Sequence, residues 1–145
     1  MDFQIIFQLF LAISLGALLG FEREYKGKEA GLQTYSLVAL GTCLFTIVSL
    51  QMVNLFPAKD VVSFDPLRII QAIAIGIGFI GAGVIFHKES GIMGLTTAAG
   101  LWVTAAVGVA IGIKLYFMAF FTTFLALLVL SGFGLLEQKI FSKKE

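Results

Sequence analysis

Five long apolar segments, each almost free of charge, constrain this chain more than any other feature. They cover residues 3–21, 32–56, 67–86, 94–113 and 115–136. A helix needs about 20 apolar residues to cross a bilayer, and in lipid its backbone polar groups must be satisfied internally. The pattern therefore predicts an all-α membrane protein, a bundle of about five transmembrane helices that forms a single domain over residues 1–145.

Composition agrees with a lipid environment. The chain is 59% hydrophobic and 13% charged, whereas soluble domains are about 45–50% apolar and about 25% charged. No Lys or Arg precedes the first apolar segment, whose first charged neighbour is Asp2. Because a secretory signal peptide has a basic start, we expect this segment to be a membrane span.

Basic residues predict the orientation. Seven of the ten Lys and Arg residues lie in the first loop, the third loop and the C-terminal tail, and three lie in the regions that face the other side. Short loops rich in Lys and Arg stay in the cytoplasm. We therefore expect a multi-pass membrane protein with its N-terminus outside and its C-terminus in the cytoplasm.

Small residues recur at every fourth position on three of the predicted helices, which places them on one helix face and allows close helix packing. These residues are Gly16 and Gly20 in the first helix, Ala74, Gly78 and Ala82 in the third, and Gly100, Gly108 and Gly112 in the fourth. We expect the first, third and fourth helices to form the tightly packed core and the Phe-rich fifth helix to face lipid.

Several function classes lack support. A net charge of +1 gives no electrostatic basis for binding nucleic acid, and the single Cys43 excludes an internal disulfide. The chain has no phosphate-binding glycine motif and no spacing typical of a catalytic triad or zinc site. No Asp, Glu, Lys or His lies near the middle of a span, where ion-coupled transport usually needs one. We expect no enzymatic activity and no cofactor.

Charged residues gather where the first helix ends, at Glu22, Arg23 and Glu24. One interpretation is a solvated membrane boundary. In the other, a carboxylate caps the N-terminus of the second or fourth helix, where free N–H groups point outward, or binds a cation. Glu22 and Glu24, with Glu29 nearby, are weak candidates for a metal site, because Mg²⁺ takes one or two carboxylates.

A second polar group opens the third predicted helix. Asp65 is suited to cap that helix, and Arg68, three residues later, can pair with it. Arg68 and Gln71 are either functional residues, contacts in an oligomer, or side chains that reach the membrane surface.

The fourth segment adds three candidates. Trp102 lies too far from the membrane surface for an interfacial belt, so we expect it to pack across a glycine-lined helix or to line a pocket. Thr96 and Thr97 can hydrogen-bond between helices. The sequence GLTT at this point resembles GLQT, which ends at Thr34, so a repeat of helical hairpins is one interpretation.

Five motifs in order resemble the MgtC/SapB family. They are GALLGFERE at 16–24, KEAGLQTYSLVALG at 28–41, DPLRIIQ at 65–71, GIGFIGAGVIF at 76–86 and GLTTAAGLWVTAAVG at 94–108. The resemblance matches Glu22-Arg23, Arg68, Gln71, the Gly-Leu-Thr-Thr run and Trp102 to family positions. Gln33 and Tyr35 replace an Arg and a His of the family pattern, so a role that depends on charge there does not carry over.

The resemblance implies an inner-membrane protein linked to growth in low Mg²⁺ and, in pathogens, to survival inside macrophages. Some family members are regulators of membrane partners, including the F-type ATP synthase, and longer ones carry a soluble C-terminal domain. Because this chain ends at Glu145, we expect it to resemble the short, membrane-only members.

Two functions remain in competition. The first is a non-enzymatic regulator that acts by helix–helix contact, with a homo-oligomer, the F-type ATP synthase or a Mg²⁺ transporter as partner. The alternative is a small oligomeric transporter or channel, for example for Mg²⁺. A regulator is expected to tolerate Glu22→Gln and to lose partner contact when Gly78 or Gly108 becomes Leu, whereas a transporter is expected to lose flux with Glu22→Gln.

Overall fold

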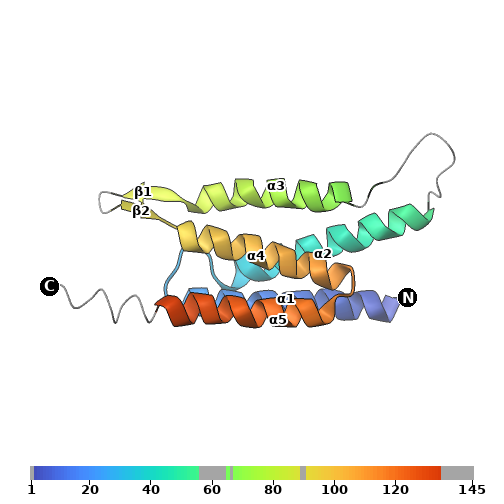
Figure 1. The fold of residues 1–145 in the computed structure, drawn as a ribbon, viewed down its shortest axis with the longest axis horizontal. Coiled ribbons are helices and arrows are strands. Elements are labelled where there is room, and N and C mark those ends of the chain that lie inside the picture. Colours follow the sequence, from blue (N-terminus) through green and yellow to red (C-terminus); the bar gives the residue numbers. More distant parts are fainter. Residues whose placement is uncertain (1, 56–64, 66, 89–90, 135–145) are drawn as a thin grey trace.

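The computed structural model describes residues 2–55, 65, 67–88 and 91–134, and within them five helices are long and apolar enough to cross a membrane. This confirms the predicted all-α class and the five spans. The helices are α1 (Asp2–Tyr25), α2 (Leu32–Leu55), α3 (Leu67–Val84), α4 (Leu95–Gly112) and α5 (Tyr116–Leu127), the last continuing as a π-helix, η1 (Leu128–Phe133). Consecutive helices run in opposite directions (Figure 1).

Two boundaries differ from the prediction. Helix α1 continues about one turn beyond its apolar run, so Glu22, Arg23 and Glu24 are helical. Helix α3 ends at Val84, and Phe86, which was expected to be helical, begins a hairpin of two short antiparallel strands, β1 (Phe86–Lys88) and β2 (Gly91–Met93). The predicted loop 57–66 lies outside the described residues except for Asp65, as do residues 135–136 of the predicted fifth helix.

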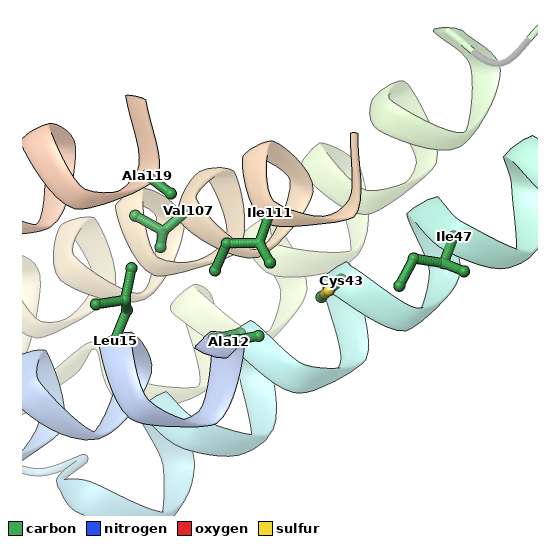
Figure 2. Packing of buried hydrophobic residues seen from close by; sticks show 8 residues of the cluster. Ala12, Leu15, Cys43, Ile47, Val107, Ile111 and Ala119 are labelled. Atoms are coloured by element: carbon green, nitrogen blue, oxygen red, sulfur yellow. The ribbon is translucent and has the colours of Figure 1, made fainter. Parts of the chain in front are cut away.

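Helix α4 occupies the centre of the bundle. Of its apolar span 56% is buried, against 11% for α3 and for α5. The main apolar core lies where α4 meets α1, α2 and α5, and Figure 2 shows its side chains pointing toward one another. It contains Ala12, Leu15, Ala39, Cys43, Ile47, Val107, Ile111 and Ala119.

The glycine stripes of α1 and α4 both pack against α2. A Cβ atom on Gly16 would lie 2.7 Å from the Tyr35 carbonyl oxygen and 2.9 Å from Ala39 Cβ, and one on Gly112 would lie 2.6 Å from Thr46 Cβ. On Gly108 it would overlap Thr42 Oγ1. Helix α2, and not the third helix as expected, therefore packs closely with α1 and α4.

The prediction that the third helix belongs to the tightly packed core is wrong for this chain. Ala74, Gly78 and Ala82 are exposed, and a Cβ atom on Gly78 would meet nothing within 4 Å. Helix α3 contacts α4 through another face, where Gly81 approaches Ala98 at 3.5 Å. A stripe shows which face a helix can offer for close packing, but it does not identify the partner. The exposed fifth helix is as expected.

Candidate functional site

A cluster of charged side chains joins the last turn of α1 to η1. Arg23 points into the bundle with 2% of its surface exposed, and its Nε pairs with the carboxylate of Glu22. Its Nη2 lies 3.4 Å from the carbonyl oxygen of Leu130. The interpretation of this end as a solvated boundary is therefore wrong for Arg23.

The carbonyl of Leu130 accepts a second hydrogen bond, from the residue that directly follows α1. Lys26 Nζ donates to it over 2.9 Å and also pairs with Glu22 Oε1 at 2.7 Å. Leu130 lies within the π-helical turn, and such turns often occur at functional sites. Ser131 Oγ donates to Glu22 Oε1 over 3.3 Å. Two cations and one carboxylate thus hold α5 against the end of α1.

The other carboxylates of this region bind the starts of two helices. Glu24 Oε2 accepts a hydrogen bond of 2.8 Å from the backbone N–H of Leu32, the first residue of α2. This confirms the interpretation of Glu24 as a helix cap. Glu29 Oε2 accepts a 2.8 Å hydrogen bond from Thr97 Oγ1, in the first turn of α4.

A buried tyrosine completes this end of the bundle. Tyr35 is fully buried, and its hydroxyl donates to the carbonyl oxygen of Thr97 over 3.1 Å. Of the neighbouring threonines, Thr97 is buried and hydrogen-bonded between segments, as expected, whereas Thr96 is exposed and Thr34 is half-buried.

A metal site at this end gains no support from the described residues. Glu22, Glu24 and Glu29 each have a protein partner. Within the described ranges, no three His, Cys, Asp or Glu side chains are grouped as metal ligands would be.

The second predicted group lies at the opposite end of the bundle. Asp65 Oδ1 accepts a hydrogen bond of 2.9 Å from Leu67 N, which confirms its role as the cap of α3. Arg68 and Gln71 are exposed on α3. Trp102 is 55% exposed, so the expectation that it packs across a glycine-lined helix is wrong.

Gln8 has a structural role that was not predicted. This buried side chain donates from Nε2 to the carbonyl oxygens of Ile111 (2.6 Å) and Gly112 (3.0 Å), at the end of α4. The last carbonyls of a helix lack partners within that helix. Gln8 supplies a hydrogen bond to the Gly112 carbonyl and adds one to the Ile111 carbonyl, which also accepts from the backbone N–H of Lys114 over 2.9 Å. An amide within an apolar run, where Gln4 is the other, was the available signal.

The model of the MgtC family matches residues 9–139. The chain belongs to the MgtC family. Its MgtC-family relatives include the "Putative magnesium transporter YhiD" of Escherichia coli K12 (41% identical, covering 99% of this chain and 66% of the relative). Protein SapB of Bacillus subtilis is 42% identical over 82% of this chain and 52% of its own length. Protein MgtC of Brucella abortus is 45% identical over 70% and 39%.

This MgtC-family chain therefore spans between about two fifths and two thirds of the length of these three relatives. The predicted membership is confirmed by the family match. No solved structure shows detectable similarity to the chain.

Proposed function

We propose that this MgtC-family protein is a non-enzymatic regulator or accessory protein of the bacterial inner membrane, linked to low-Mg²⁺ adaptation and membrane energetics, that acts through helix–helix contact. The observation that carries the proposal is an apolar groove of about 750 Å³ between α2 and α3. Its walls include Leu37, Phe45, Ile73 and Ile80. A transmembrane helix of a partner fits this chemistry.

Two features of the groove favour a helix as its occupant. Gly41 and Gly76 line it, and a Cβ atom on either would meet nothing within 4 Å, so an incoming backbone has close access. Ser49 also lines it, and its Oγ is the one buried side-chain oxygen or nitrogen without a hydrogen-bond partner among the described residues. A polar side chain on a partner helix would supply that bond.

The partner is a second copy of the chain or another membrane protein, such as the F-type ATP synthase or a Mg²⁺ transporter. The protein is placed with its N-terminus outside and its C-terminus in the cytoplasm, because Arg23, Lys26 and Lys28 lie at one end of the bundle. Arg68 and Lys114 lie at the opposite end.

The alternative is a small oligomeric transporter or channel. One relative is named a putative magnesium transporter, which favours this reading. Against it, none of the spans carries Asp, Glu, Lys or His near its middle, and Glu22 and Glu24 bind protein groups. A metal ion could bind either carboxylate only after it had displaced these protein partners.

A measurement of Mg²⁺ flux distinguishes the regulator from the transporter. The purified protein is placed in liposomes that contain a Mg²⁺-sensitive dye, and empty liposomes are the control. We expect no flux above the control from protein that remains folded. Mg²⁺ entry above the control would replace the regulator by the transporter.

Cross-linking tests the contact surface. Ile80→Cys places a thiol in the groove, whereas Phe117→Cys places one on the exposed face of α5 as the matched control. The natural Cys43 is buried and gives little background. In native membranes we expect a thiol-reactive photo-cross-linker to trap a specific adduct with Ile80→Cys alone. Equal adducts from both positions would contradict the proposal.

A further inference from the structure

A second cavity, of about 700 Å³, opens at the end of the bundle where α1 ends, between the first turn of α4 and η1. It lies apart from the α2–α3 groove and shares no lining residue with it. Both charged and apolar side chains line it. No step in the proposed regulatory contact uses it.

The charged side of this cavity is predominantly cationic. Arg23, Lys26 and Lys28 line it, against the single carboxylate of Glu29. Lys26 uses two of its three N–H donors on Leu130 and Glu22, so one donor remains for a ligand. The carboxylate of Glu22 lies behind Arg23 and Lys26 and compensates part of their charge.

The start of α4 adds backbone donors to the same cavity. Gly94, Leu95, Thr96 and Thr97 line it, and the residue at the cap position, Gly94, offers no side chain to bond the first N–H groups. The start of a helix carries a partial positive charge and unpaired N–H groups, an arrangement that binds phosphate. A phosphoryl group in this cavity would therefore meet both backbone donors and cations.

Exposed apolar side chains continue from the cavity along the bundle. Val129 and Phe133 are 50% and 65% exposed, and the exposed Ile92 and Leu95 also line the cavity. A free phosphate ion would leave these surfaces uncovered, whereas a lipid would cover them with its acyl chains. Basic pockets between membrane helices are known to bind anionic lipid headgroups.

We propose that this cavity binds the headgroup of an anionic phospholipid, with its phosphate beside Lys26, Lys28 and the start of α4. The acyl chains lie along Val129 and Phe133. Bound lipid then ties α1, α4 and η1 together, because Arg23 of α1, the first turn of α4, and Val129 and Phe133 of η1 all line the cavity. The site takes a phosphate-bearing ligand with a hydrocarbon tail.

The test measures thermal unfolding of the whole purified chain in detergent. The added probe is dioleoyl phosphatidylglycerol, dioleoyl phosphatidylcholine or inorganic phosphate, each at the same concentration. Because a ligand that binds the folded state raises its stability, we expect the rise in Tm with phosphatidylglycerol to be at least about twofold the rise with phosphatidylcholine. Inorganic phosphate is expected to give no rise.

Two variants probe the cavity without disturbing an ion pair described above. Lys28→Gln removes an exposed cation of the lining, and Thr96→Glu adds a negative charge where it repels phosphate yet suits the start of a helix. The matched control is Lys114→Gln, which removes an exposed cation from the opposite end of the bundle. Both cavity variants should lose most of the phosphatidylglycerol-specific rise, and the control should keep it.

Three results would overturn the proposal. The first is an equal rise in Tm with both lipids, which would mean that the headgroup charge is not recognised. The second is an equal phosphatidylglycerol response in Lys28→Gln, Thr96→Glu and the control. The third is a rise with inorganic phosphate as large as with the anionic lipid, which would identify a soluble anion as the ligand. The contact with a partner helix is unaffected by any of them.

Discussion

Arg23 is the one charged residue in the buried class among the described side chains, and its partners explain how the bundle accommodates it. The Glu22 carboxylate balances its charge, and the carbonyl of Leu130 accepts from its guanidinium. A buried charge left without its partner is strongly destabilising. The α1 end of the bundle therefore depends on the whole cluster and not on one ion pair.

At this scale we predict that Arg23→Gln lowers the free energy of unfolding by about 3 kcal/mol, the lower end of the range for breaking a buried pair, because Lys26 still pairs with Glu22. Unfolding in detergent titrated with SDS measures it. The matched control is Arg68→Gln, an exposed arginine at the start of α3, which should change stability by no more than about 0.5 kcal/mol. Equal losses in both variants would show that the cluster does not stabilise the bundle.

At the scale of the element, α2 is the helix against which α1 and α4 both pack. Its contact face presents Tyr35, Ala39, Thr42 and Thr46, and glycines on the two partners provide the close approach. Helix α3 has comparable small residues, yet three of them face away from the bundle. The same residue type therefore has opposite consequences on different helices.

Gly108 and Gly78 should respond oppositely to the same change. Gly108→Ala forces a Cβ atom against Thr42 Oγ1 and the Ala39 carbonyl, and we expect a loss of about 1–3 kcal/mol from overpacking. Gly78→Ala adds a Cβ atom in open space and should cause no loss. The measurement is SDS-induced unfolding of both variants, and a loss at Gly78 equal to that at Gly108 would refute the assigned packing.

This contrast changes the earlier expectation for Gly108. A larger side chain there was expected to remove contact with a partner protein, but Gly108 is buried against α2. Its substitution therefore tests the fold of the chain itself. Gly76, which lines the α2–α3 groove, is the glycine whose substitution tests the partner surface.

At the scale of the whole molecule, the bundle has two polar ends with different chemistry. The hairpin lies at the end of the bundle where α1 finishes (Figure 1). The charged cluster and the lipid cavity lie at the same end, whereas Lys114 follows the end of α4. Lys114 adopts a left-handed conformation (φ 65°) that closes α4, and its Nζ lies 3.3 Å from Gln4 Oε1. The difference in basic residues between the ends predicts the orientation.

Thiol labelling tests that orientation. We predict that Leu115→Cys, in the turn after α4, reacts with a membrane-impermeant maleimide in intact spheroplasts. Lys28→Cys, in the loop after α1, should react only after the membrane is permeabilised, since the proposed orientation puts this loop in the cytoplasm. The parent protein, with Cys43 buried, gives the background. The reverse pattern would invert the orientation and move the lipid cavity to the outer leaflet.

The sequence by itself determined that the chain folds in a lipid bilayer and that its fold is all-α. Apolar runs of spanning length leave no alternative to helices in lipid, and this local requirement does not depend on which helices meet. Helix caps at Asp65 and Glu24 were also predictable, because capping acts over a few residues.

Only the tertiary structure decided which helix occupies the centre and which polar residues meet. Gln8 reaches α4 across 103 positions in the sequence, and Arg23 reaches Leu130 across 107. Such contacts depend on the packing of helices that are all equally apolar, so hydropathy does not distinguish among the possible arrangements. The side chains on the α2 contact face are Tyr35, Ala39, Thr42 and Thr46 and include no glycine. The glycine pattern therefore did not predict that α1 and α4 pack on this helix.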